Sequence, residues 1–77
     1  MTAKELRDRI ESLCTHILFD YNEKECGVDP FNTEHFDMWC GDVFMEAHSI
    51  DEVMQVPFFD GKALEDIADQ IENVEGL

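Results

Sequence analysis

The clearest pattern in the chain is an alternation of side chains around a short turn signal. His35–Cys40 and residues 43–48 flank Gly41-Asp42, a favoured two-residue hairpin turn. Counting outward from this turn gives one face of apolar pairs: Cys40 with Val43, Met38 with Met45, and Phe36 with Ala47. The opposite face pairs Trp39 with Phe44, Asp37 with Glu46, and His35 with His48. A slip of one residue would mix the two faces, so the pattern predicts this register.

An earlier segment shows the same period of two. Ile17, Phe19 and Tyr21 alternate with Leu18 and Asp20. Asn22-Glu23 can make a tight turn, although glutamate suits positive φ poorly. Residues 25–28 then return antiparallel, which sets Phe19 opposite Cys26 and Ile17 opposite Val28 on one face. We expect Asp29-Pro30 to end this strand, because proline gives no N–H to a ladder, and residues 31–34 to form a loop.

The N-terminal segment is expected to be a helix. Thr2 and Glu5 have capping-box spacing, in which each side chain satisfies a free backbone N–H of the other residue. Apolar residues then recur at helical intervals. They are Leu6, Ile10, Leu13, Cys14 and Ile17. We expect this helix to end near His16.

The segment after the second hairpin predicts two further helices. Ser49 and Glu52 form another capping box before a helix from Ile50 to about Gln55, which Pro57 ends. Phe58 and Phe59 are expected in the core. Asp60-Gly61 makes a turn and can cap the last helix. Its apolar stripe is Leu64, Ile67, Ala68 and Ile71, with Glu65, Asp66, Asp69 and Glu72 outside.

The predicted order of elements is α-β-β-β-β-α-α over a single domain of residues 1–77. This order indicates an α+β fold, a small antiparallel sheet of two β-hairpins with helices packed on one face. The sequence does not fix the order of the hairpins in the sheet. Two separate two-stranded ribbons are therefore the alternative.

Charge narrows the classes of partner. The formal net charge is -14, from 19 acidic and 5 basic residues. Nucleic acid and anionic membranes are poor partners for such a chain, because both are bound through clustered lysine and arginine. A protein with a basic surface would be attracted instead. The plain alternative is that the charge serves solubility alone.

The cysteines and the N-terminus bear on location. Cys14, Cys26 and Cys40 show no C-x-x-C spacing, and the N-terminal residues show no apolar signal segment. No apolar run reaches the length of a membrane span. We therefore expect reduced thiols in the cytoplasm.

No constellation for chemistry emerges. Cys26, Cys40, His35 and His48 could converge on a metal, but Cys40 and His48 point to opposite faces in the predicted register. The abundant negative charge disfavours a reactive thiolate, and Asp37 with Glu46 lacks the apolar walls of an acid catalyst. Phosphate-loop, dinucleotide-binding and EF-hand patterns are absent. We predict no catalytic residues, no metal and no cofactor, and a protein that is not an enzyme.

The outer face of the second hairpin is the candidate binding surface. Trp39 and Phe44 would form an apolar centre ringed by Asp37, Asp42 and Glu46. Tryptophan is favoured at binding hot spots, and an exposed apolar patch often marks a partner site. The alternative is that a helix or a second copy of the chain covers this face.

Four segments carry a resemblance to known sequences. They are residues 25–31 (ECGVDPF), 36–39 (FDMW), 49–54 (SIDEVM) and 57–62 (PFFDGK). They resemble segments of small uncharacterised acidic proteins of gut Firmicutes, and the resemblance spans Leu18 to Ile71. It implies a bacterial cytosolic origin, on a mobile element, and brings no known activity or site residue.

These observations predict a non-enzymatic module for protein–protein interaction or regulation. One alternative is a DNA mimic from a mobile element, which inhibits a nucleic-acid-binding protein with carboxylates clustered on one face. Glu65, Asp66, Asp69 and Glu72 are the candidates for such a cluster. The other alternative is a small-molecule or metal-binding domain, which needs a concave pocket. The partner and the oligomeric state, including a homo-oligomer, stay open.

Overall fold

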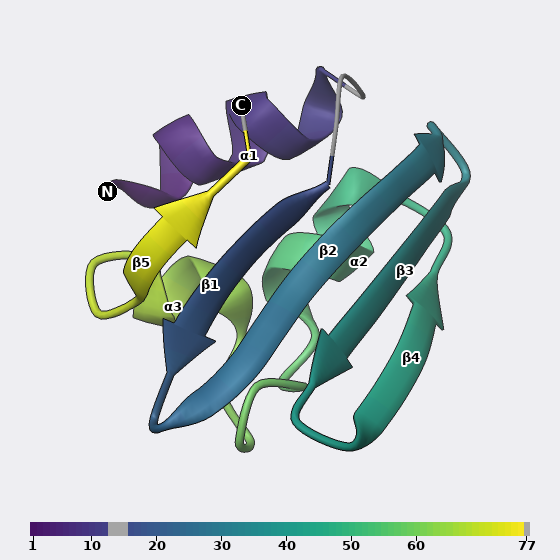
Figure 1. Cartoon of the computed structure of the whole chain (residues 1–77). Coiled ribbons are helices and arrows are strands. Elements are labelled where there is room, and N and C mark those ends of the chain that lie inside the picture. Colours follow the sequence, from purple (N-terminus) through teal and green to yellow (C-terminus); the bar gives the residue numbers. More distant parts are fainter. Residues whose placement is uncertain (13–15, 77) are drawn as a thin grey trace.

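The computed structural model describes residues 1–12 and 16–76, and within them the chain forms three helices and one five-stranded antiparallel sheet. The helices are α1 (Ala3–Glu11), α2 (Ile50–Gln55) and α3 (Leu64–Ile67). The strands are β1 (Ile17–Tyr21), β2 (Lys24–Asn32), β3 (His35–Cys40), β4 (Val43–Ala47) and β5 (Glu72–Glu75). The helices lie behind one face of the sheet, and the other face carries no helix (Figure 1). The fold is α+β with helices on one side, as predicted.

The two hairpins join into one sheet with strand order β4-β3-β2-β1-β5. Both predicted registers are confirmed. Phe19 lies opposite Cys26 in the first hairpin, and Trp39 lies opposite Phe44 in the second. β2 and β3 pair with each other along six positions, so the alternative of two separate ribbons is wrong.

The second strand of the first hairpin, β2, is longer than predicted. β2 continues through Asp29 and Pro30 to Asn32, so Pro30 does not end it and residues 31–32 are not loop. β1 begins opposite Val28, so the proline lies beyond the end of β1 and needs no donor on that side. Pro30 instead pairs with Phe36 of β3, and a register shift follows before the turn. The extension brings more of β2 alongside β3.

The helical ends also differ from the predictions. The Thr2–Glu5 capping box is present, but α1 ends at Glu11, well before His16, and Ile17 belongs to β1. Leu13 and Cys14 lie outside the described residues. Ser49 caps α2 as predicted, by accepting from the N–H of Glu52. The carboxylate of Glu52 reaches back to the N–H of His48, one residue earlier than an ideal capping box.

The C-terminal segment was predicted least well. α3 ends at Ile67, and residues 72–75 form β5, the edge strand beside β1. Glu72 therefore lies on a strand and not on the outside of a helix. Asp60-Gly61 makes the predicted turn, but the cap position of α3 is Ala63, which has no side-chain cap bond. Asp60 instead bonds Lys24 and Asn22 of the first hairpin.

The core lies between the sheet and the helices. Its fully buried residues come from every layer. The largest are Phe36, Phe59, Leu6, Ile10, Ile17, Met38, Met54, Leu64 and Ile67. Phe59 is buried and Phe58 is half-buried against it, which confirms both as core residues. No helix among the described residues has the length and apolar character needed to cross a membrane.

Candidate functional site

The sheet face that the helices leave uncovered holds the candidate site, and we call it the open face. Strand alternation directs Phe36, Met38 and Cys40 into the core, and therefore directs Asp37 and Trp39 to the open face. Met45 of β4 is half-buried and Val43 is 58% exposed, so the inner face is less covered at this edge than the sequence predicted. Phe44 is 76% exposed on the open face.

An apolar row crosses four of the five strands on the open face. Phe44 pairs with Trp39, Trp39 with Gly27, and Gly27 with Leu18, so consecutive strands contribute neighbouring positions. Leu18 in turn lies opposite Glu75 of β5. We call Phe44, Trp39, Gly27 and Leu18 the apolar row. It unites residues of both hairpins.

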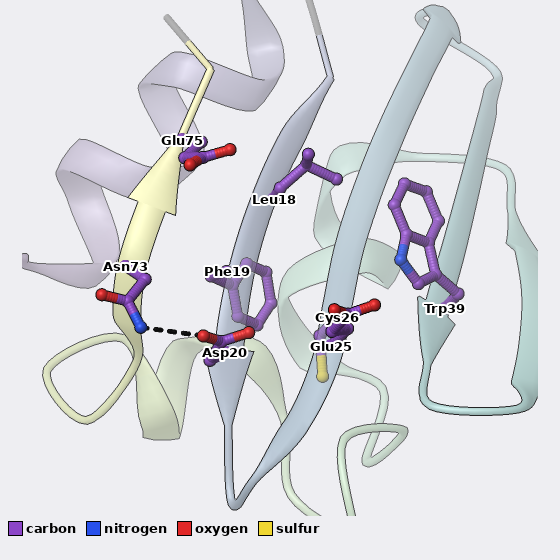
Figure 2. A pocket seen from close by; sticks show the side chains of 8 residues that line it. All are labelled: Leu18, Phe19, Asp20, Glu25, Cys26, Trp39, Asn73 and Glu75. Carbon is purple, nitrogen blue, oxygen red and sulfur yellow. Dashed lines mark hydrogen bonds between the residues drawn. The ribbon is translucent and has the colours of Figure 1, made fainter.

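The absence of a side chain at Gly27 leaves the space that the Trp39 indole occupies. A Cβ atom at Gly27 would overlap Cζ2 of Trp39 and lie 2.7 Å from Cε2. The indole therefore lies directly over the β2 backbone and is half-buried without any helix above it. Figure 2 shows the ring reaching from β3 toward β2, with Leu18 on the strand beyond. The expectation that the indole points away from the core is confirmed.

Acidic residues lie on both sides of the apolar row. On one side Glu46, Asp37 and Asp29 follow one another across β4, β3 and β2. On the other side Glu25 lies opposite Asp20, and Asp20 lies opposite Glu72. Like charges opposite each other weaken strand pairing, so these rows oppose the stability of the sheet. The open face thus combines an apolar centre with two acidic borders.

Basic groups lie elsewhere. Arg7 pairs with Asp51 at 2.7 Å, and Lys4 pairs with Asp8 on α1. Lys24 bonds Asp60 on the helix side of the sheet. This bond, followed by one from Asn22, holds the pKa of Asp60 below its ordinary value. These three cations therefore pair with carboxylates outside the two acidic borders.

Two histidines lie beside the carboxylates of Asp37 and Glu46. Nε2 of His35 donates to Oδ1 of Asp37 at 3.0 Å and lies 3.6 Å from Oε1 of Glu46. Nδ1 of His48 lies 3.6 Å from Oε2 of Glu46. β4 ends at Ala47, so the predicted His35–His48 pair is not part of the β3–β4 ladder.

Within residues 1–12 and 16–76, one group has the donor set for a cation: His35, Asp37 and Glu46, with ligand atoms within 4.8 Å of one another. Glu46 is exposed, the other two residues are half-buried, and His35 already donates to Asp37. The convergence of cysteines with histidines does not occur, because Cys26 and Cys40 lie in the core.

Two shallow depressions flank Trp39 on the open face. One has a volume of about 400 Å³ and is lined by Asp29, Asp37, Met38, Trp39, Phe44, Met45 and Glu46. The other, about 310 Å³, is drawn in Figure 2 and is lined by Leu18, Phe19, Asp20, Glu25, Cys26, Trp39, Asn73 and Glu75. The indole is the wall common to both.

The structure brings together four of the five residues predicted for the site. Trp39, Phe44, Asp37 and Glu46 line the same depression, while Asp42 lies in the exposed turn outside it. Sequence reasoning did not assign Leu18, Gly27, Asp29 and Glu25 to the site. Alternation in the first hairpin already separated Leu18 from the core, but the β2–β3 register was needed to place it beside Trp39.

Comparison with protein-family models, with curated proteins and with solved structures gives no significant match. The chemistry of the open face is therefore the basis for assigning a function.

Proposed function

We propose that this chain is a non-enzymatic protein-interaction module, which binds a basic partner protein through the open face. The observation that carries the proposal is the apolar row between two acidic borders on a sheet face that no helix covers. An aromatic centre with a charged rim is the usual composition of a hot spot and its surround. We place the module in the cytoplasm, where the thiols of Cys26 and Cys40 would stay reduced.

The chemistry of the face defines the partner. A matching segment would present apolar side chains to Phe44 and Trp39 and lysine or arginine to the borders. Such cations would relieve the repulsion between Asp37 and its neighbours Glu46 and Asp29. This repulsion destabilises the free protein, so its relief would favour binding. Two copies of this chain would instead bring acidic borders together, which disfavours self-association through this face.

The distribution of carboxylates favours this function over nucleic-acid mimicry. A mimic needs its charges gathered on one side, and Glu65, Asp66 and Asp69 do lie exposed near α3. Twice as many carboxylates, six, form the two borders of the apolar row on the other side of the molecule. Exposed aromatic surface between the charges also suits a protein partner better than a cleft built for phosphates.

The binding test uses Trp39, the only tryptophan of the chain, as its reporter. The probe is a synthetic peptide of alternating lysine and leucine, and its control replaces lysine by glutamate. We expect the cationic peptide to shift Trp39 emission to shorter wavelength in a saturable titration. Binding should weaken as salt is raised, because exposed charge pairs are screened.

Matched variants separate the open face from general charge. Asp37→Asn with Glu46→Gln should raise the dissociation constant about fivefold, on the basis of two exposed charge contacts. Phe44→Ala should raise it about tenfold. Glu65→Gln with Asp69→Asn removes the same charge from the helix side and should change it little. Equal effects of the two charge pairs, or no response of Trp39, would contradict the proposed function.

A further inference from the structure

The core holds two cysteines in direct contact. Cys26 of β2 and Cys40 of β3 lie opposite each other in the ladder, and their Sγ atoms are 3.3 Å apart. The side chain of Cys26 is oriented to donate to the sulfur of Cys40. Both residues are buried, with 1% and 4% of their surface exposed, and both are free thiols.

The backbone around this pair suits a covalent bond. The N–H of Gly41 donates to the carbonyl oxygen of Glu25 at 2.9 Å, across the same ladder. Since bonded and non-bonded pairs alternate in antiparallel sheets, the neighbouring Cys26–Cys40 pair is a non-hydrogen-bonded one. The Cα atoms of such pairs are about 4.5 Å apart, which falls within the range of about 4.4–6.8 Å that disulfides span.

The location gives a bond here a structural consequence. Cys26 belongs to the first hairpin and Cys40 to the second, so the pair lies at the seam where the two hairpins meet. The same inner row continues to Phe19 on one side and Val43 on the other, both apolar. Two alanine side chains would also pack in such a row. Two thiols in contact can, in addition, be joined by oxidation.

We propose that Cys26 and Cys40 are an oxidation site, at which a peroxide converts the two thiols into a disulfide that staples the hairpins together. One thiolate attacks a peroxide oxygen, which forms a sulfenic acid and releases water. The second thiolate attacks that sulfur, the S–S bond forms, and a second water leaves. The two thiols lose two protons and two electrons, and hydrogen peroxide is reduced to two molecules of water.

Burial sets the rate of this step. Desolvation, followed by the hydrogen bond to Cys40, raises the pKa of the Cys26 thiol to about 12. The thiolate is the reactive form, so oxidation at neutral pH is slow and accelerates as pH rises. The site therefore responds to sustained oxidant and not to a brief exposure.

The test uses Cys14→Ala, which leaves only the proposed pair. Folded protein is treated with hydrogen peroxide, and its intact mass and non-reduced peptide map are measured. We expect the mass to fall by two hydrogen atoms, with one linked peptide pair containing Cys26 and Cys40. The midpoint of thermal unfolding should rise by about 10 °C and return on reduction with dithiothreitol.

Wild-type protein and a second variant make the outcome decisive. In wild type the peptide map distinguishes Cys26–Cys40 from any link to Cys14, so the test does not depend on the folding of the variant. Cys14→Ala with Cys40→Ala should gain oxygen and never lose two hydrogens. Free thiols after treatment, separate oxygenation of each sulfur, or linkage that appears only in urea would overturn the proposal.

Discussion

Gly27 is the residue on which the shape of the open face depends most. Its lack of a side chain lets the Trp39 indole lie on the β2 backbone, between the two depressions. A glycine inside a strand is costly by itself, since it loses more freedom on folding and packs nothing. An aromatic ring that covers it from the neighbouring strand compensates for part of that cost.

Gly27→Ala should therefore displace the indole. The new methyl group overlaps the ring, and we expect a loss of about 1–3 kcal/mol in the free energy of unfolding. Trp39 emission should shift to longer wavelength as the ring moves into water. Urea denaturation and fluorescence measure both effects.

Gly61→Ala is the matched control, because no atom lies within 4 Å of a Cβ there and its cost is only that of a positive φ. It should destabilise the protein without changing Trp39 emission. A Gly27→Ala protein with wild-type emission would contradict the account of the ring.

Cys26 makes the free energy of unfolding depend on pH in the alkaline range. Its pKa is raised to about 12 by burial, whereas a thiol in an unfolded chain titrates near about 8.5. Between these values the folded state holds a proton that the unfolded state has released, so stability is complete below about pH 8.5 and is lost as pH rises toward about 12. Under reducing conditions, the free energy of unfolding of wild type should fall more steeply over this range than that of Cys26→Ala.

Urea denaturation at several pH values measures these slopes. Only the difference between the two slopes is informative, because the two proteins share every other residue. Equal slopes would mean that burial does not keep this thiol protonated.

At the scale of elements, the hairpins illustrate what local sequence determines. Both registers follow from alternation and turn position, and the structure confirms them. The pairing of β2 with β3 and the strand β5 were not predictable in this way. The first depends on which hairpin edges meet in space. The second depends on Glu72–Glu75 finding the free edge of β1, although its composition gives no strand signal.

The turn of the first hairpin carries a local conflict. Asn22 and Glu23 both have positive φ, at 51° and 65°, as a type I′ turn requires. The Cβ atom of glutamate disfavours positive φ, and glycine has no Cβ atom. Glu23→Gly should therefore raise the free energy of unfolding by about 0.5–1 kcal/mol, measured by urea denaturation. A less stable variant would show that the Glu23 side chain contributes contacts that outweigh its backbone strain.

The edge strand β5 pairs with the backbone edge of β1 that would otherwise be free. Its ladder pairs include Leu18 with Glu75, and the amide of Asn73 donates to Asp20 at 2.8 Å. A chain ended after Ile71 would leave the β1 edge unpaired. We expect faster amide hydrogen exchange at Leu18 and Asp20, with little change in β3 and β4. Uniform acceleration across the sheet would instead mean that β5 is needed for the whole fold.

At the scale of the whole molecule, the helices and the charges divide the surface into two sides. One side carries α1, α2 and α3, with ion pairs within α1 and between α1 and α2, and the other is the open face. The sequence predicted this face only over the second hairpin. Its continuation to Leu18 needed the fold, because it depends on the pairing of β2 with β3, which joins the two hairpins.

The most direct measurement is a map of where a basic ligand contacts the folded chain. The isotope-labelled protein is titrated with the lysine–leucine peptide, and backbone amide and indole chemical shifts are followed. We expect the largest changes at Phe44, Trp39, Gly27 and Leu18. Changes centred on the helix side, near Glu65 and Asp69, or spread evenly over the acidic residues, would contradict it.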